Sequence, residues 1–202
     1  MTVGVGKGMD KAINTSGEMG HVNDCVLQRT LRHEVSCTGV GLHTGTQVTL
    51  KLRPAPSDTG IVFERTDIFD LDPVVPAVWD RVVDTRLCTV IGNGDGVTVG
   101  TIEHLLAALA GCGIDNAHVE VSGPEVPIMD GSSEPFVTLV GCAGVVELLA
   151  PRRVIRVLKA VNVKIKDSRA ALLPAAWPKL DVEIDFQSSV VSNQALSLGL
   201  VN

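Results

Sequence analysis

Hydrophobic and polar residues alternate along several short stretches of the chain, as they do in strands buried on one face. The clearest stretch is QVTLKLRPA, in which Val48, Leu50 and Leu52 alternate with polar residues before two prolines end the pattern. GIVFERTD and NAHVEVSG are two further candidate strands. We therefore predict a strand at each of these three places, in an ordered region that begins near Val26.

A hairpin and a helix are predicted between the second and third of these strands. DTRLCTVIGNGDGVTVGT holds apolar residues on both sides of an Asn-Gly-Asp-Gly cluster, residues 93–96, which accepts the positive φ values of a tight turn. Residues 102–110 are strong helix formers, and Thr101 is a candidate N-cap. Gly111 or Gly113 gives the signal for the end of this helix.

A second helix is predicted within IMDGSSEPFVTLVGCAGV. Pro135 is tolerated in its first turn, because the N–H that proline lacks would have no helical partner there. We expect the helix to end near Gly141 or Gly144, and to be capped by Asp130, Ser132 or Ser133.

Strands return after LLAPRR, which has the composition of a linker. AVNVKIKD and LDVEIDF alternate with a period of two, and SNQALSLGLVN follows them, but no amphipathic helix is predicted to cover their apolar faces. A few strands with one uncovered face are only marginally stable. We therefore expect residues 152–202 to be poorly ordered or aggregation-prone by themselves.

These elements together predict an α+β fold. We expect residues 1–25, which are rich in glycine and polar residues, to be a disordered tail. Residues 26–147 are predicted to form a complete α+β domain, and residues 148–153 a linker. Residues 154–202 are predicted to be an incomplete second α+β domain that contains strands only.

Composition and charge exclude several classes of protein. A net charge of −6 and an aromatic content of 3% argue against a nucleic-acid partner, which needs basic surfaces and stacking platforms. The five cysteines are dispersed with no CxxC pair, as in reduced cytosolic proteins. No apolar run is long enough to span a bilayer, and the N-terminus has no signal-peptide pattern. We expect a cytoplasmic protein.

Two ionisable residues, Glu103 and His104, begin the first predicted helix, in TIEHLLAALAGCG. On spacing alone, the commoner arrangement is a glutamate stabilised by the helix dipole beside a partly buried histidine. The apolar helix behind the pair favours a functional interpretation, since buried ionisable groups need partners. The N-terminus of a helix also keeps an imidazole neutral, and a neutral imidazole can bind a metal.

One histidine cannot form a catalytic zinc site, which uses three protein ligands and one open position. The helix offers no second histidine, because Gly100 and Ala108 stand where an HExxH-like pattern would need one. Of the other histidines, His43 is the strongest candidate for a site residue, since the glycines of TGVGLHTG permit close backbone approach. His33 fits a surface position, and His118 a packed or edge position in a strand.

Four longer segments carry a resemblance to a known family. They are QRTLRHEVSCTGVGLHTGTQVTLKLRPAPSDTGIVFERTD, DTRLCT, TIEHLLAALAGCGIDNAHVEV and PEVPIMDGSSEPF. With the rest of the chain from about Val26 to Asn202, they resemble the zinc-dependent UDP-3-O-acyl-N-acetylglucosamine deacetylases of lipid A biosynthesis. The resemblance implies two similar domains, each a β-sheet packed on two helices, with the active site between them and only the first domain complete here.

The resemblance also implies roles for individual residues. Glu103 matches the general base that activates the zinc-bound water, and His104 matches one of three zinc ligands. His43 matches a histidine that lines the site, and Leu87 and Cys88 match positions close to the metal and substrate. Asp130 also matches a family motif, but we interpret it as a cap of its helix.

The implied cofactor is Zn²⁺, although iron suits similar mixed ligand sets. The implied substrate is an acylated UDP-amino sugar, and the full-length enzyme is expected to be a monomer. The other two zinc ligands and the general-acid histidine of the family have no match in this chain, so we expect little deacetylase activity from the 202 residues alone. Two interpretations remain open: a truncated, inactive fragment of the enzyme, or a non-catalytic binding half that needs a partner chain.

Overall fold

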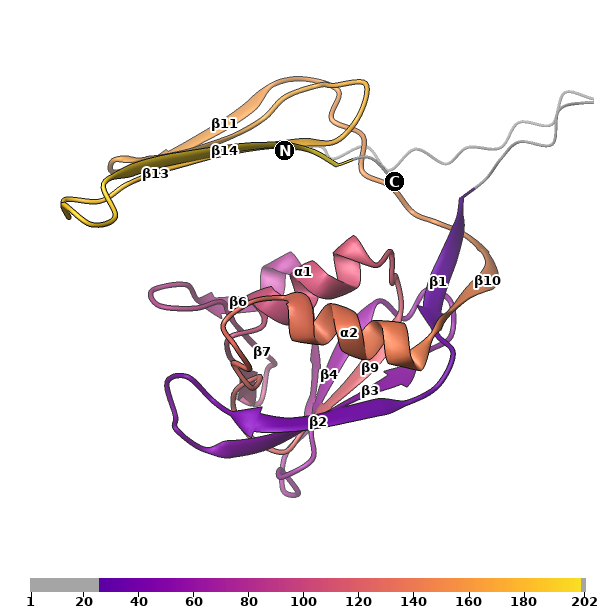
Figure 1. The fold of residues 1–202 in the computed structure, drawn as a ribbon. Coiled ribbons are helices and arrows are strands. Elements are labelled where there is room, and N and C mark those ends of the chain that lie inside the picture. The colour runs from indigo at the N-terminus through magenta and orange to yellow at the C-terminus, as the bar shows by residue number, and fades with distance from the viewer. Residues whose placement is uncertain (1–25, 201–202) are drawn as a thin grey trace, which may run out of the picture. The chain divides into compact units, whose positions relative to one another are not determined.

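The computed structural model of the protein describes residues 26–200 (Figure 1). Contacts within the chain divide it into two compact units, one that ends at Arg152 and one that begins at Arg153. The predicted disordered tail, residues 1–25, lies outside the described residues. The first unit contains both helices of the described chain, and an α+β fold is confirmed.

A five-stranded sheet forms the base of the first unit. In spatial order it consists of β2 (Val35–Val40), β3 (Gln47–Pro54), β9 (Ala117–Val121), β4 (Ile61–Arg65) and β5 (Val74–Pro76). All neighbours are antiparallel except β9 and β4, which run parallel. The predicted alternation in β3 is confirmed, because Val48, Leu50 and Leu52 are fully buried while the residues between them are not.

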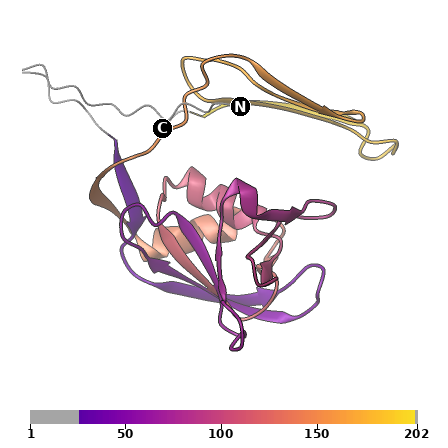
Figure 2. The ribbon, with the colours of Figure 1, turned by 180° about the vertical axis from the view of Figure 1, so that it is seen from behind.

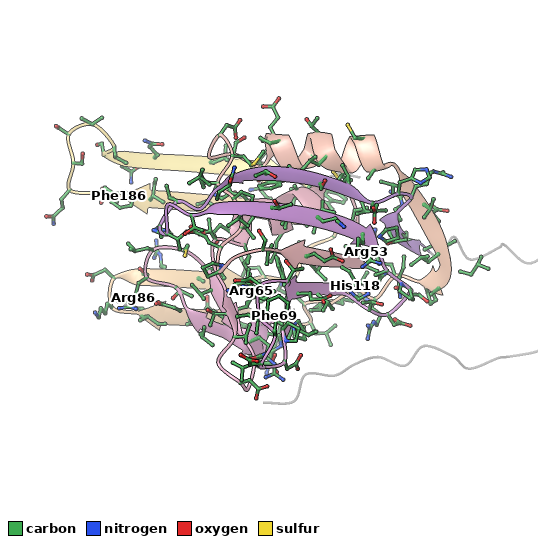
Figure 3. The ribbon with its side chains drawn as sticks, turned by 90° about the horizontal axis from the view of Figure 1, so that it is seen from below. Arg53, Arg65, Phe69, Arg86, His118 and Phe186 are labelled. Atoms are coloured by element: carbon green, nitrogen blue, oxygen red, sulfur yellow. The ribbon has the colours of Figure 1, made fainter. Side chains whose placement is uncertain are left out.

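Two helices, α1 (Glu103–Gly111) and α2 (Glu134–Ala143), cover one face of this sheet (Figures 1 and 2). Leu105 and Leu109 of α1 and Phe136 and Val140 of α2 are buried with the apolar strand residues in one core. Their spacing of four residues places each pair on a single face of its helix. The opposite face of the sheet is polar: Arg53 on β3 is paired in register with His118 on β9 (Figure 3).

The start of α1 differs from the prediction. Ile102, not Thr101, is the N-cap residue, and no side chain caps the helix. Thr101 has a φ of 55°, and its hydroxyl donates a hydrogen bond to Glu125 rather than to the first turn. The preference of threonine for capping a helix is therefore outweighed here by the hydrogen bond of Thr101 to Glu125, which lies later in the chain.

The start of α2 follows a chain of short-range hydrogen bonds. Ser133 is the N-cap residue by position, but its side chain makes no capping bond. The hydroxyl of Ser132 accepts from the Glu134 N–H at 3.2 Å, and Asp130 accepts from the backbone N–H of Ser132 at 2.9 Å. Pro135 lies in the first turn as predicted. Asp130 therefore supports the turn before the helix rather than the helix itself.

Smaller strands complete the first unit. β6 (Val82–Asp84), β7 (Val90–Gly92) and β8 (Thr98–Val99) form a three-stranded sheet after a 3-10 turn, η1 (Trp79–Arg81). The predicted hairpin turn joins β7 to β8, with the Asn93 N–H 3.0 Å from the Val97 oxygen and a φ of 80° at Gly96.

The segment predicted as a linker, residues 148–153, is largely a strand. β1 (Leu27–Leu31) pairs antiparallel with β10 (Val145–Pro151), and the Arg152 N–H donates to the Val26 oxygen at 2.7 Å. The composition of LLAPRR suggested irregular structure, but the distant β1 provides a hydrogen-bonding partner for this segment. Such pairing is set by tertiary context rather than by local composition.

The second unit contains two hairpins. β11 (Val161–Ile165) pairs with β12 (Ser168–Leu172), and β13 (Lys179–Asp185) pairs with β14 (Asn193–Gly199). The predicted strands are confirmed, and within residues 153–200 the structure has no helix. Every residue from Leu158 to Leu200 is exposed. Across the described chain, no helix is long and apolar enough to cross a membrane.

Candidate functional site

Glu103 and His104 occupy the first turn of α1, and both are half-buried. The carboxylate of Glu103 accepts a hydrogen bond from the backbone N–H of Thr89, at 3.0 Å from Oε2. Successive helical residues diverge by about 100°, so the imidazole of His104 points along a different direction from the carboxylate. The hydrogen bond ties the start of α1 to the segment that carries Leu87 and Cys88.

Asp130 lies close enough to His104 for their charges to interact. Hydrogen bonds from the backbone and hydroxyl of Ser132 lower the pKa of Asp130, and the charge of His104 lowers it further. Asp130 is exposed and its short-range bonds go to Ser132, at 2.9 and 2.8 Å from Oδ1. The geometry fits a residue that shapes the turn beside His104.

No group of three or more His, Cys, Asp or Glu residues that could hold a metal ion occurs within residues 26–200. His104, in the first turn of α1, is the residue placed to act as a ligand. A catalytic zinc ion takes three protein ligands. The described residues therefore fit one position of such a site and do not complete it.

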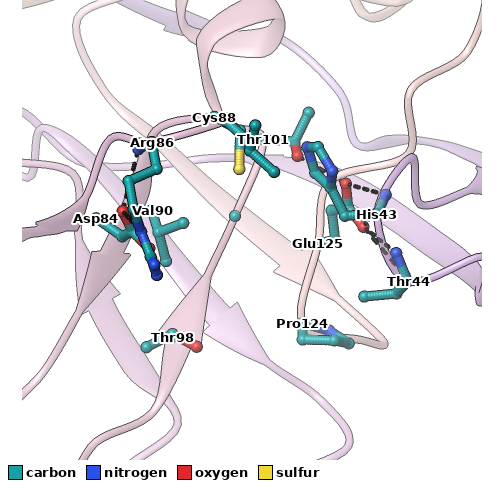
Figure 4. Close-up of a pocket in the computed structure, with 12 residues that line it drawn as sticks. His43, Thr44, Asp84, Arg86, Cys88, Val90, Thr98, Thr101, Pro124 and Glu125 are labelled. Atoms are coloured by element: carbon teal, nitrogen blue, oxygen red, sulfur yellow. Dashed lines mark hydrogen bonds and ion pairs between the residues drawn. The ribbon is translucent and has the colours of Figure 1, made fainter.

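An open pocket of about 600 Å³ lies beside the start of α1 (Figure 4). All three residues predicted to line a site, His43, Leu87 and Cys88, are on its wall, although they come from different loops. Glu103 and His104 are not among the lining residues. The remaining lining residues are Thr44, Asp84, Arg86, Val90, Thr98, Gly100, Thr101, Pro124 and Glu125.

Glu125 is a site residue that the sequence analysis missed. Its side chain is 2% exposed, yet it carries a carboxylate. That carboxylate accepts hydrogen bonds from the Thr101 hydroxyl at 2.7 Å, from the His43 N–H at 3.1 Å, and from both the N–H and the hydroxyl of Thr44 at 3.0 Å. Figure 4 shows it between Thr101 and the turn at His43 and Thr44.

The hydrogen bonds decide the charge state of Glu125. Burial raises the pKa of this carboxyl, but the bonds from Thr101, His43 and Thr44 outweigh burial, so the pKa lies below its ordinary value. The group is thus a buried carboxylate anion at neutral pH. No local pattern in the sequence marks this residue, because its four donor groups belong to His43, Thr44 and Thr101, which lie far from it in the chain.

Close contacts require glycine at two of the three glycine positions of the His43 loop, Gly39 and Gly41, as predicted, whereas a Cβ at Gly45 would meet nothing within 4 Å. A Cβ on Gly41 would collide with the Thr44 hydroxyl and would lie 2.5 Å from the Glu125 carboxylate. A Cβ on Gly39 would lie 2.9 Å from the ring of Pro127. Gly45 has a φ of 64°, which favours glycine.

The opposite rim of the pocket is formed by an ion pair. The Arg86 guanidinium binds Asp84 with Nη2 2.6 Å from Oδ2, and the Arg86 N–H also donates to Asp84 at 3.0 Å. Hydrogen bonds from Arg86 lower the pKa of Asp84 to about 2. The pair therefore remains ionised at all physiological pH values, and its charges largely cancel at the rim.

Comparison with known proteins identifies the family of this chain. Residues 28–202 match the model of the LpxC family, described as UDP-3-O-acyl N-acetylglycosamine deacetylase. The chain belongs to this family. A UDP-3-O-acyl-N-acetylglucosamine deacetylase from Myxococcus xanthus is 53% identical over 85% of the chain. Namesakes from Pseudomonas entomophila and Idiomarina loihiensis are 52% and 49% identical over 85% and 87% of it.

The chain spans only about half the length of these curated relatives. The matched region covers 54% of the Myxococcus deacetylase and 57% of the Idiomarina deacetylase. The family match therefore includes all the residues that line the pocket. The relatives also have a further portion that this chain does not match.

Proposed function

We propose that the chain carries one half of the active site of a deacetylase that removes the N-acetyl group of UDP-3-O-acyl-N-acetylglucosamine. The observation that supports this most strongly is the placement of Glu103 and His104. They are adjacent in the first turn of α1, and Glu103 is bonded to the Thr89 N–H, next to Leu87 and Cys88 of the pocket wall. The relatives bear the name of this enzyme.

In this proposal Glu103 is the general base and His104 is one zinc ligand. A bound Zn²⁺ would supply Lewis-acid chemistry, polarising the acetamide carbonyl. Glu103 would accept the proton of the water that attacks this carbonyl carbon, and the C–N bond would break to give acetate and the free amine. The Thr89 N–H, which donates to Oε2 of Glu103, would hold this carboxylate in place.

His43, Leu87 and Cys88 would line the substrate side of the site. The pocket joins apolar surface from Leu87, Cys88 and Val90 to a polar rim at His43 and Arg86. This mixture suits a substrate that has both an acyl chain and a charged nucleotide. We further propose that the protein acts in the cytoplasm as part of lipid A synthesis, a location that fits its five dispersed cysteines.

The proposal is tested with a chimera. Residues 26–202 are joined, in register, to the portion of the Myxococcus deacetylase that the chain does not match, and acetate release and zinc content are measured. We expect an active chimera with about one zinc per chain. Glu103→Gln should lower kcat by about 100- to 10,000-fold, the range for loss of a general base. His104→Ala should lower zinc content as well as kcat.

Glu134→Gln is the matched control, because Glu134 occupies the first turn of α2 as Glu103 does in α1, but is exposed. This variant should retain the activity of the unmodified chimera. The proposal is overturned if Glu103→Gln keeps activity within threefold. It is also overturned if the chimera is folded by circular dichroism but inactive while the intact Myxococcus deacetylase turns over in the same assay.

A further inference from the structure

The buried carboxylate of Glu125 joins two segments that are distant in the sequence and border the same pocket. One is the turn from Gly41 to Thr46, and the other is the chain that leads into α1. Five hydrogen bonds reach the carboxylate, and every donor is a neutral N–H or hydroxyl. Within residues 26–200, no ion pair of Glu125 with a basic side chain is formed. Burying an anion that only neutral donors stabilise is costly in free energy. We therefore ask which function the Glu125 carboxylate serves at this position.

The first role of Glu125 is at the entrance of α1. The Gly100 N–H donates to the Pro124 oxygen at 2.9 Å, and the Val126 N–H donates back to the Gly100 oxygen at 3.0 Å. These bonds fix Gly100 against the backbone on both sides of Glu125. The Thr101 hydroxyl then adds the 2.7 Å bond to the carboxylate.

Thr101 has an unusual backbone that the Glu125 contact explains. Its φ of 55° is in the left-handed region, which β-branched residues rarely adopt. Such a conformation persists when surrounding contacts determine it, and Thr101 is 2% exposed with its hydroxyl on Glu125. Because Glu103 is only two residues further on, the direction in which α1 presents Glu103 and His104 depends on this conformation.

The second role of Glu125 is at the His43 turn. The turn closes on itself through the Gly41 N–H to the Thr46 oxygen, at 2.9 Å, and the Gly45 N–H to the Gly41 oxygen, at 3.0 Å. The carboxylate accepts from the N–H groups at the tip of this turn, His43 and Thr44. The absence of a side chain on Gly41 leaves the space that Glu125 fills.

We propose that Glu125 is a positioning residue of the deacetylase site, which fixes the start of α1 and the His43 turn relative to each other. The inference rests on the proposed function, because it concerns where Glu103, His104 and His43 are held. Glu125 need not touch the substrate for this. It acts through Thr101 on one side and through the backbone of His43 and Thr44 on the other.

Glu125→Gln is the informative variant, because it keeps the shape of the side chain. An amide has one oxygen acceptor, and its NH₂ group would face either the Thr101 hydroxyl or the N–H groups of the turn. If the NH₂ group faces the turn, the N–H groups of His43 and Thr44 lose their acceptor; if it faces Thr101, the hydroxyl must accept instead of donate, so the link is altered in either orientation. In the chimera described above, we expect kcat to fall about 100-fold, the loss that a displacement of about 1 Å in a catalytic group can cause.

Three further readouts separate positioning from general destabilisation. KM should change by less than threefold, zinc content should stay at about one per chain, and the variant should be fully folded at the assay temperature.

A second variant, Thr101→Val, should also lower kcat. The double variant Thr101→Val with Glu125→Gln should lose much less kcat than the product of the two single losses, since both substitutions break the same link. Glu120→Gln is the control, because Glu120 is a partly buried glutamate that pairs with Arg53 and Lys51 on the polar sheet face. It should leave kcat unchanged.

A separate measurement uses the 202-residue chain without any assay of activity. In Glu125→Gln, amide exchange at His43 and Thr44 should become at least tenfold faster, and the imidazole resonances of His43 and His104 should both shift in NMR spectra. The inference is overturned if these exchange rates and resonances are unchanged, or if kcat of the variant chimera stays within threefold. It is equally overturned if kcat falls only in proportion to the folded fraction. An inactive unmodified chimera would instead overturn the proposed function, and the NMR result would still decide the positioning role.

Discussion

The guanidinium of Arg152 holds the carboxylate of Asp115, with Nε 2.9 Å from Oδ1. The same carboxylate accepts from the backbone N–H of Arg29 at 2.8 Å, and Arg152 also donates to the Gly113 oxygen at 2.6 Å. One acidic side chain thus connects β1, the loop after α1 and the residue that follows β10. The exposed fraction of the side chain is 17% for Arg152 and 24% for Asp115, so the pair is mostly shielded from solvent.

Replacing Asp115 by alanine should destabilise the first unit. The change leaves the Arg29 N–H and the Arg152 guanidinium without their acceptor, which costs roughly 1–3 kcal/mol for buried groups. Thermal unfolding of the 202-residue chain measures this as a lower Tm. Glu147→Gln is the control, because its ion pair with Arg29 is 3.3 Å long and about half exposed; such pairs contribute at most about 1 kcal/mol. Equal effects of the two substitutions would contradict the central role of Asp115.

Phe136→Ala should be among the most destabilising single substitutions. Phe136 is fully buried between α2 and the sheet, and truncation of a buried aromatic ring costs about 3–5 kcal/mol. Urea unfolding followed by circular dichroism gives the free energy. The next residue on the helix, Val137, is 43% exposed, so Val137→Ala should cost less than about 1 kcal/mol. A loss below about 1.5 kcal/mol for Phe136→Ala would show that α2 does not pack as described.

Gly41→Ala should disturb the pocket as well as stability. The added methyl group would overlap the Thr44 hydroxyl and the Glu125 carboxylate, and overpacking of this kind costs roughly 1–3 kcal/mol. In NMR spectra, the amide signals of residues 41–46 and of Thr101 should move together. Gly94→Ala is the control, because nothing lies within 4 Å of a Cβ at that position. Unchanged signals at Thr101 would mean that the two segments are not linked through Glu125.

The Asp84–Arg86 pair predicts a specific acid titration. The pKa of Asp84 is lowered to about 2 from an ordinary value of 3.8, so the folded state prefers the ionised form. The stabilisation from this pair is fully present above pH 3.8 and is lost as the pH falls through about 2. Carboxyl carbon shifts in NMR should show this midpoint, and Arg86→Met should move it toward 3.8.

Asp130 serves as the internal reference in this titration. Its pKa is lowered by Ser132 rather than by Arg86, so its midpoint should not change in Arg86→Met. A midpoint of Asp84 that is the same with and without Arg86 would show that the pair does not form in solution.

The second unit should exchange its amide hydrogens rapidly in the 202-residue chain. Its four strands form two hairpins whose residues are all exposed, including Val163, Leu180 and Val182. Hairpins without a buried face are at best marginally stable. We expect amides of β11 and β13 to exchange roughly 1,000-fold or more faster than those of β3. Strong protection across residues 160–186 would contradict this expectation.

The sequence predicted elements best where a pattern was local. The alternation of Val48, Leu50 and Leu52 specified β3, and the Asn-Gly-Asp-Gly cluster specified the turn between β7 and β8. The helix formers after Ile102 specified α1 to within one residue at each end. In each case the residues that determine the element lie inside it.

Predictions failed where partners are distant in the chain. The end of β10 was predicted as part of a linker because its partner, β1, lies more than a hundred residues earlier. Thr101 was predicted to cap α1, but Glu125 competes for its hydroxyl. Glu125 could not be predicted as a site residue, since nothing in GPEVPIMDG reveals that two other segments converge on it. The family resemblance pointed to Glu103, His104 and His43, and their roles stay predictions until the chimera is measured.

The parallel pairing of β9 with β4 has a consequence for how the chain folds during synthesis. β9 is the central strand, between β3 and β4, so the β2–β3 pair and the β4–β5 pair can join into one sheet only when residues 117–121 are present. A ribosome that adds about 5–20 residues per second needs roughly 3–11 s to travel from Arg65 to Val121. During that time, β3 and β4 carry apolar residues that have no central strand to join. The order of the strands thus delays closure of the first core, and a molecular chaperone that binds extended apolar segments has those seconds in which to act.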